Sequence, residues 1–385
     1  MSVKRFIACL MFFVTAVSGI NVGAAEAPVL DGKAYILMEA STGKVLVQNN
    51  ADEALPPASV TKIMTLLLIY DNVDSGKIKW DDNVTVSVHA AGMGGSQIFL
   101  EANEVQTVET LTKAIAIASA NDAAVAMAEH IAGSEEAFVS MMNEKAEKLG
   151  MKNTTFKNAC GLDTDGHVMS ARDIAIMSRE LITKYPEITR FTTVWQDTIT
   201  HKTAKGEKEF GLTNTNRLIK WYDGATGLKT GSTGNAFYCL SGTAKKNGME
   251  LIAVIMACPD PKQRFREVMK MLDYGYVNYE LKKGEPVGKI AANVPVTGGE
   301  EDSVNAIVKE EVTYLSERGK TALKSETKIN DGLKAPIKQG DVIGEIVYTL
   351  GDESAGSSPL IAEKDVERAG FGKNVKRLFE LWFKG

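Results

Sequence analysis

The chain has 385 residues, of which 44% are hydrophobic and 24% charged, and 49 acidic residues against 44 basic ones give a formal net charge of −5. This composition is that of a globular protein, so it excludes intrinsic disorder, collagen-like repeats and a small disulfide scaffold. A negative net charge without a long basic run argues against nucleic acid as a partner. The length suggests roughly two domains.

Residues 1–25 predict a secretory signal peptide. Lys4 and Arg5 form a positive start, an uncharged apolar run extends from Phe6 to Ile20, and small residues follow at a cleavage site after Ala25 or Ala27. The apolar run has the length of a signal-peptide core and is too short to span a bilayer comfortably. We therefore expect an exported protein without a transmembrane helix.

The first folded region predicts an α+β domain over residues 28–279. A hairpin is expected around Ser41-Thr42-Gly43, and a helix begins after Pro56-Pro57 with a dense apolar face. Helical patterns continue to about Tyr185, strand patterns dominate from Trp195, and a final helix closes the domain. Such an order fits an antiparallel sheet with helices on its faces. The expected strands are 34–39, 44–48, 228–230, 237–244 and 251–257, and the expected helices are 59–70, 108–119, 122–132, 135–149 and 262–279.

The C-terminal part predicts two further units. Short alternating runs such as Val304–Val308 and Val342–Tyr348 indicate a small all-β, sandwich-like domain over 281–362, with Gly351–Ser358 as a connection leading out of it. Residues 369–385 predict an amphipathic helix. Its apolar residues Phe371, Val375, Leu378, Phe379 and Trp382 share one face, and its basic residues Lys373, Lys376, Arg377 and Lys384 outnumber Glu380.

This last helix is expected to lie in the plane of a membrane surface. The apolar face would enter the interface, and the basic residues would favour anionic lipid. The alternative is that the helix packs back on the β domain. The first interpretation places the mature protein on the outer face of the cytoplasmic membrane.

Cysteine and histidine give no sign of a metal site. After Cys9 has left with the signal, the three remaining cysteines leave at least one thiol free, and Cys239 and Cys258 lie in strand-like runs as small core residues. The sequence has no Cys-x-x-Cys, and none of its four histidines forms an i, i+4 pair. A zinc hydrolase is therefore disfavoured, and we expect no metal or other cofactor.

The segment Ser59-Val60-Thr61-Lys62 is the first candidate for chemistry. A serine hydroxyl needs a base, and residues three apart on a helix share one face, so Ser59 and Lys62 can touch. Burial would lower the pKa of the lysine and let it act as that base. The same pattern at 41–44 and 325–328 is interpreted as solvated surface pairs. Taken alone, Ser59 is as readily a helix cap as a nucleophile.

Ser119-Ala120-Asn121 interrupts two helices inside an Ala- and Ile-rich stretch. In isolation it is explained by a helix break in which Asn121 or Asp122 caps the next helix. The functional alternative is that Ser119 relays a proton while Asn121 donates its amide to a substrate carbonyl.

Lys229-Thr230-Gly231 occurs once, at the end of a short strand, and Ser232 follows it. Lysine and threonine on a strand can bind a carboxylate, and glycine removes a side chain that would block a substrate along the edge. The plain alternative is a basic strand end that enters a turn.

In this order the three motifs are specific, although each is weak alone. Together with 57–65 and 161–167, they resemble the low-molecular-mass penicillin-binding proteins that are serine-type D-alanyl-D-alanine carboxypeptidases. The resemblance covers about residues 28–277, and the β domain and basic tail resemble the rest of that family less specifically. It implies a β-lactamase/transpeptidase-like domain whose central antiparallel sheet is flanked by helices.

The resemblance also implies a reaction and its residues. The expected reaction is hydrolysis of the terminal D-Ala–D-Ala bond of peptidoglycan stem pentapeptides through an acyl-enzyme, with β-lactams as covalent inhibitors. Backbone N–H groups of Ser59 and Ser232 would form the oxyanion hole. The implied catalytic residues are Ser59, Lys62 and Ser119, and the implied substrate-binding residues are Asn121, Lys229, Thr230, Gly231 and Ser232. Asp163 and His167 are expected to order a loop at the cleft edge, and Arg217 to be a surface residue.

Two alternatives use the same motifs differently. A β-lactamase would need a deacylating Glu, and no Glu-x-x-Leu-Asn string occurs between Ser119 and Lys229. A catalytically silent penicillin sensor or wall-binding module would show a broken motif, whereas all three are intact. An α/β-hydrolase is disfavoured because the sequence has no Gly-x-Ser-x-Gly.

Overall fold

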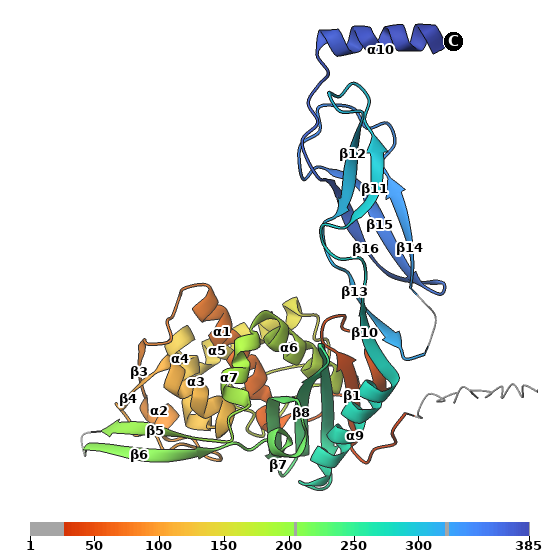
Figure 1. The fold of residues 1–385 in the computed structure, drawn as a ribbon. Coiled ribbons are helices and arrows are strands. Elements are labelled where there is room, and N and C mark those ends of the chain that lie inside the picture. Colours follow the sequence, from red (N-terminus) through yellow and green to blue (C-terminus); the bar gives the residue numbers. More distant parts are fainter. Residues whose placement is uncertain (1–26, 204–205, 320–322, 385) are drawn as a thin grey trace, which may run out of the picture.

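A computed structural model describes residues 27–203, 206–319 and 323–384, so the expected signal peptide lies outside the described residues. Figure 1 shows a first domain of helices around a sheet, an elongated β domain that stands away from it, and a helix, α10, at the far end. The predicted α+β class with a following all-β domain is confirmed.

The first domain is built on a five-stranded antiparallel sheet in the order β2-β1-β9-β8-β7. The strand β7 forms one edge and carries Lys229, Thr230 and Gly231. One side of that strand is therefore not covered by another strand of this sheet. The strands are β1 (Ala34–Glu39), β2 (Val45–Asn49), β7 (Ala225–Thr233), β8 (Phe237–Lys246) and β9 (Met249–Cys258).

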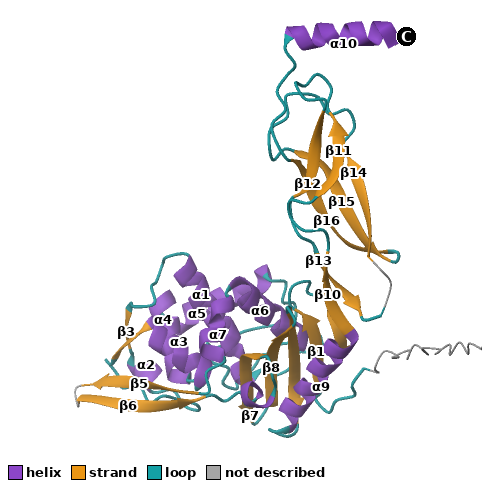
Figure 2. Cartoon of the chain, viewed as in Figure 1, coloured by secondary structure: helices purple, strands orange, loops and turns teal. Residues whose placement is uncertain are grey.

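Both faces of this sheet are covered, as Figure 2 shows. On β9, Ile252, Val254 and Met256 belong to the larger core with most of the helices, and the alternate residues Leu251 and Ala253 belong to a smaller core. Alternate side chains of a strand point to opposite faces, so a continuous apolar run is what a strand buried on both faces requires. The helix α9 (Gln263–Asn278) covers the face of the smaller core.

A buried helix runs through the larger core. It begins with a 3₁₀ turn, η1 (Ala58–Thr61), and continues as α1 (Lys62–Asp74), so the predicted helix start at Ser59 falls within the 3₁₀ turn. Apolar side chains surround α1, which is the pattern of a fully buried helix. The other helices of this domain are α2 (Val88–Ala91), α3 (Val108–Ile117), α4 (Asn121–Ala132), α5 (Glu135–Lys148), α6 (Ala171–Lys184), α7 (Thr189–Thr192) and α8 (Leu218–Trp221), and a second 3₁₀ turn is η2 (Pro186–Ile188).

Two small antiparallel ribbons lie beside the helices. They pair β3 (Asn83–Thr85) with β4 (Val105–Thr107), and β5 (Gln196–Thr203) with β6 (Gly206–Thr213). In Figure 1 the β5–β6 ribbon extends along the lower side of the helices.

The second domain contains a five-stranded sheet in the order β11-β12-β16-β15-β14 and a two-stranded sheet, β10 with β13. The prediction that Gly351–Ser358 leads out of the domain as a connection is wrong, because most of it lies in β16, which pairs with both β12 and β15. Glycine and serine have low strand propensity, which the pairing of this stretch with β15 overrides here. The strands are β10 (Tyr279–Lys283), β11 (Ile290–Pro295), β12 (Ser303–Val308), β13 (Thr313–Glu317), β14 (Leu323–Ile329), β15 (Val342–Leu350) and β16 (Glu353–Ala362).

The chain ends in α10 (Phe371–Lys384), which confirms the predicted terminal helix. Within the described residues, no helix is both long and apolar enough to cross a membrane. Cys160, Cys239 and Cys258 are buried free thiols, which agrees with the interpretation of Cys239 and Cys258 as small core residues.

Candidate active site

The structure brings the first two motifs together around the amine of Lys62. Its Nζ donates hydrogen bonds to Ser59 Oγ at 2.9 Å, to Asn121 Oδ1 at 2.6 Å and to the carbonyl oxygen of Cys160 at 2.7 Å. The bond to Ser59 follows from the turn that separates the two residues, and Asn121 enters as the first residue of α4. Three acceptors satisfy the three protons of an ammonium group.

Compared with water, the environment of Lys62 favours the neutral form of its amine. Its side chain is fully buried, and this burial lowers its pKa to about 8, against the opposing effects of Cys160 and the Asp122 carboxylate. Desolvation disfavours the charged form of a lysine. A neutral amine is therefore accessible near physiological pH, as a general base requires.

The second and third motifs meet at the amine of Lys229. Its Nζ donates to Ser119 Oγ at 2.8 Å and to the Thr230 carbonyl at 3.1 Å. Burial lowers the pKa of Lys229 well below its usual value, and Lys62 and Arg264 lower it further. An anion bound beside Lys229 would oppose this lowering of its pKa, because a nearby opposite charge favours the protonated form. The Thr230 hydroxyl lies 2.7 Å from that of Thr215.

Gly231 lets β7 pass directly beside the turn that carries Ser59. A Cβ at this position would lie 2.7 Å from the Pro57 carbonyl oxygen and 3.0 Å from the Ser59 nitrogen. The sequence predicted a glycine that keeps a substrate path open, and the structure adds that no side chain fits between β7 and η1. Ser232, the next residue, is exposed on the same strand.

Backbone strain is concentrated beside these groups. Ala58 and Ser119 adopt left-handed conformations with φ of 49° and 61°, which cost a non-glycine residue roughly 1–2 kcal/mol each. The Ala58 carbonyl lies so close to Gly161 that a Cβ there would be 1.9 Å away. Strain of this kind persists only where the surroundings enforce it, and it often marks functional sites.

Several supporting residues were not predicted. The buried Asp122 carboxylate accepts from the backbone N–H groups of Ile98, Leu100 and Ala123, so it anchors a loop. The alternative in which Asn121 or Asp122 caps α4 is not supported, because Ala120 is its N-cap and no side chain bonds there. The buried Arg264 donates to the Gly231 carbonyl at 2.9 Å. In the sequence, the signals for these two residues were a charged residue beside Asn121 and a single arginine on the core face of a helix.

Asp163 and His167 hold the loop at the cleft edge. His167 Nε2 lies 2.9 Å from the Thr61 hydroxyl, and the Lys157 N–H donates to Nδ1 at 3.3 Å, so Nε2 carries the proton. Burial lowers the pKa of His167 to about 4, which keeps the ring neutral at pH 7. Asp163 accepts from the Thr233 hydroxyl at 2.7 Å, which ties the loop to β7.

Two other points from the sequence concern Arg217 and metal binding. Arg217 is exposed, with its guanidinium 5.7 Å from the centre of the Trp221 ring, which agrees with a surface residue. Among the residues that the structure describes, no group of three or more His, Cys, Asp or Glu side chains is arranged to hold a metal ion.

The comparisons with known proteins agree on one family. Residues 21–260 match the family model described as D-alanyl-D-alanine carboxypeptidase, and residues 279–368 match that of the penicillin-binding protein 5 C-terminal domain. The chain is 47% identical to the D-alanyl-D-alanine carboxypeptidase DacF of Bacillus subtilis over 92% of its length and 90% of that protein. It is 36% identical to DacC of Escherichia coli over 93% of its length and 91% of that protein.

A solved structure agrees with both halves of the chain. The crystal structure of penicillin binding protein 5 from Haemophilus influenzae matches with a TM-score of 0.75 at 32% identity. The match covers 89% of this chain and 100% of that one, so it includes the β domain as well as the helical one.

Proposed function

The chain belongs to the D-alanyl-D-alanine carboxypeptidase family, and we propose that Ser59 is its nucleophile, with Lys62 as the base that activates it. As a member of this family, the protein is a serine-type carboxypeptidase that hydrolyses the terminal D-Ala–D-Ala bond of peptidoglycan stem peptides and binds penicillin. Similarity over both domains favours this function over a β-lactamase. The observation that carries the residue assignment is the 2.9 Å hydrogen bond between Lys62 Nζ and Ser59 Oγ.

The proposed reaction has two steps. Ser59 Oγ attacks the carbonyl carbon of the penultimate D-Ala while its proton passes to the neutral Lys62 amine. The N–H groups of Ser59 and Ser232 stabilise the oxyanion. Ser119 then passes its hydroxyl proton to the nitrogen of the leaving D-Ala and takes up the proton held by Lys62, which leaves the Lys62 amine neutral again. Water attacks the resulting ester with Lys62 again as base, which releases the shortened peptide and restores the serine.

Recognition of the substrate is assigned to the edge strand and to Asn121. Lys229 and Thr230 would hold the terminal carboxylate, while Gly231 leaves the strand edge open. Asn121 uses its oxygen for Lys62 and donates from Nδ2 to the Gly94 carbonyl at 2.7 Å. An amide nitrogen carries two protons, so the second can reach a substrate carbonyl.

The reactivity of the free enzyme toward a β-lactam should rise with pH. A base with a pKa of about 8 is neutral in about one molecule in ten at pH 7 and in about nine in ten at pH 9. We expect the second-order rate constant of acylation by benzylpenicillin, measured by stopped flow below saturation, to increase by nearly tenfold across this range. This second-order constant reports the protonation of groups in the free enzyme, to which the pKa of about 8 applies. A flat profile between pH 7 and pH 9 would remove Lys62 as the base.

We further propose that the protein is exported and held at the outer face of the cytoplasmic membrane. The proposed division is a signal peptide at 1–25, a peptidase domain at 28–279, a β domain at 281–362 and an anchor at 369–385. The β domain would then act as a spacer, since α10 lies at its end far from the peptidase domain (Figure 1).

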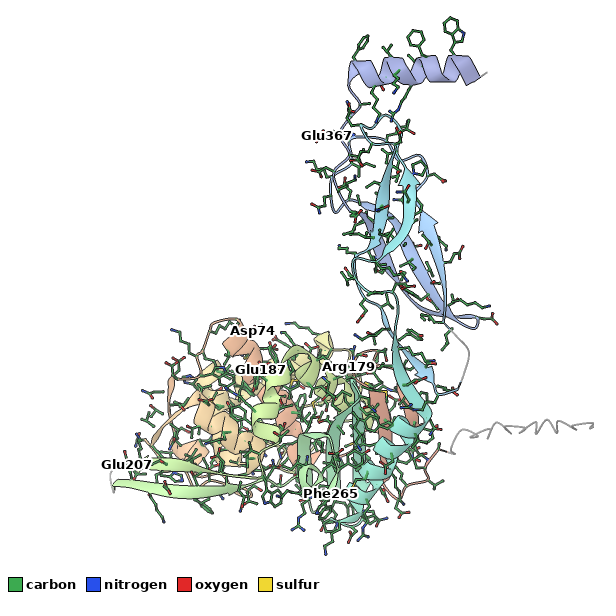
Figure 3. The ribbon with its side chains drawn as sticks, in the orientation of Figure 1. Asp74, Arg179, Glu187, Glu207, Phe265 and Glu367 are labelled. Atoms are coloured by element: carbon green, nitrogen blue, oxygen red, sulfur yellow. The ribbon has the colours of Figure 1, made fainter. Side chains whose placement is uncertain are left out.

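The exposure of α10 supports the anchor. Its apolar residues Phe371, Leu378, Phe379 and Trp382 are between 52% and 86% exposed, and Figure 3 shows ring side chains of this helix that point away from the β domain. On the other side, Lys373 and Arg377 pair with Asp302 of the β domain. These pairs hold the polar side of the helix on the domain and leave the apolar side for an interface.

Truncation after Arg368 is expected to abolish membrane binding and leave the hydrolysis of small peptides unchanged. The test is sedimentation of the protein without residues 1–25 with anionic liposomes at low salt, compared with the truncated form. Because part of the basic charge is already paired with Asp302, apolar burial should dominate, and binding should weaken only partly at high salt. Equal sedimentation of both forms, or none of the longer form, would contradict the anchor.

A further inference from the structure

A cavity of about 590 Å³, outside the candidate active site, lies between the β5–β6 ribbon and the loop that follows α2. Three rings line it, those of Phe99, His201 and Phe210, and its polar groups include Thr203, Glu207 and Lys208. Glu207 is labelled on the ribbon in Figure 3. Apolar walls with a few polar groups, in a volume between about 300 and 1,000 Å³, are typical of small-molecule sites.

Phe99 is held in an unusual way. Its side chain is 66% exposed, and its backbone adopts a left-handed conformation with φ of 62°, which few bulky residues adopt. The N–H groups of its neighbours Ile98 and Leu100 both donate to the buried Asp122 carboxylate at 3.1 Å. The strained backbone of Phe99 and the two charge-assisted hydrogen bonds of its neighbours therefore hold an aromatic ring in an exposed position.

The other two rings are fixed as well. Phe210 makes edge-to-face contacts with Phe99 and His201, at centroid distances of 5.9 and 5.6 Å. His201 Nδ1 lies 2.8 Å from Glu104 Oε1, and this buried carboxylate also accepts from the Gln106 amide. The cavity wall is thus preorganised rather than formed by mobile side chains.

The loop that carries Phe99 also touches the candidate active site. The carbonyls of Gly94 and Ser96 accept hydrogen bonds from Asn121, both at 2.7 Å. Phe99 lies three positions after Ser96, so their Cα atoms lie within about 11 Å, and the four residues on the glycan side of the scissile bond span about 13 Å when extended. The loop therefore links the surroundings of Asn121 to the cavity over a length comparable to that part of a bound stem peptide.

Building on the proposed function, we propose that this cavity binds a sugar ring of the glycan to which the stem peptide is attached. The aliphatic C–H face of a pyranose packs well on the electron-rich faces of aromatic rings. Its hydroxyl and acetamido groups would bond the polar side chains at the rim, which combine acidic, basic and hydroxyl groups rather than one sign of charge. Such a rim suits a neutral polyhydroxyl ligand better than a single ion.

The test compares D-Ala release from a free pentapeptide with release from the same peptide on its N-acetylglucosamine–N-acetylmuramic acid disaccharide. For the wild type we expect a kcat/KM about tenfold higher for the disaccharide substrate, through a lower KM. Phe99→Gly removes the ring and suits the positive φ, and it should bring this ratio close to one. Phe99→Tyr should retain the ratio. The control Val88→Ala, at a 78% exposed apolar side chain that does not line the cavity, should leave both rates unchanged.

A readout without catalysis separates this inference from the proposed function. The peptide-free disaccharide should bind the Ser59→Ala protein in titration calorimetry, and adding Phe99→Gly should abolish that binding. If the wild type releases no D-Ala from either substrate, the proposed function fails while the calorimetry still decides the cavity. Equal kcat/KM values in the wild type, or a ratio that survives Phe99→Gly, would overturn the sugar site.

Discussion

Replacing Ser59 with alanine is expected to abolish both D-Ala release and the covalent penicillin adduct while the protein stays folded. Loss of the nucleophile from a serine hydrolase reduces kcat by at least about 10⁴-fold. The fold should persist because the Ser59 hydroxyl accepts one bond from Lys62, which keeps Asn121 and the Cys160 carbonyl as acceptors. No capping bond is lost either, because no side chain caps η1 or α1.

The measurement uses Nα,Nε-diacetyl-Lys-D-Ala-D-Ala for turnover and labelled penicillin with peptide mapping for the adduct. Ser41→Ala is a matched control, because Ser41 has the same spacing to a lysine but lies in the β1–β2 turn, where its hydroxyl bonds Glu39. That variant should keep full activity. An adduct on Ser119, or on any residue other than Ser59, would refute the assignment.

Much of the fold could be predicted because burial leaves a pattern. The continuous apolar run of β9 reflects a strand covered on both faces, and the dense apolar face after Pro57 reflects the buried helix α1. The strand β16 escaped prediction because its small polar residues show no alternation of apolar and polar side chains, and they are held in the sheet by pairing with the preceding strand β15. Pattern analysis sees the face that a segment buries but not the partners along its edges.

The candidate site divides in the same way. Side chains with distinctive chemistry, such as Ser59, Lys62 and Lys229, could be picked from the sequence because their spacing is informative. The acceptor that Cys160 supplies to Lys62 is a backbone carbonyl, and any residue at that position carries one. The left-handed conformation of Ser119 and the close approach of Gly231 to η1 likewise depend on tertiary contacts.

Replacing Lys229 with alanine should reduce kcat/KM for peptides with a free C-terminal carboxylate by between about 30-fold and several thousandfold. Loss of one partner of a buried charge-assisted contact costs roughly 2–5 kcal/mol, and each 1.4 kcal/mol is tenfold. Two effects act together here. The carboxylate loses its cation, and Ser119 loses the donor that fixes its hydroxyl at 2.8 Å. The loss of the cation for the carboxylate would raise KM, and the loss of the donor to Ser119 would lower kcat.

A peptide amidated at its C-terminus separates these two effects. It lacks the carboxylate, so the wild type should cleave it poorly, and Lys229→Ala should cost less with the amide than with the acid, as in a double-mutant cycle. Lys328→Ala is the control, at an exposed lysine on β14 of the second domain, and should change neither rate. If the wild type cleaves the amide as fast as the acid, Lys229 does not bind the carboxylate. If Lys229→Ala lowers kcat/KM by the same factor for the acid and the amide, Lys229 acts only by positioning Ser119. The amide lacks only the contact to the carboxylate, so an equal loss on both substrates means that Lys229 does not make this contact.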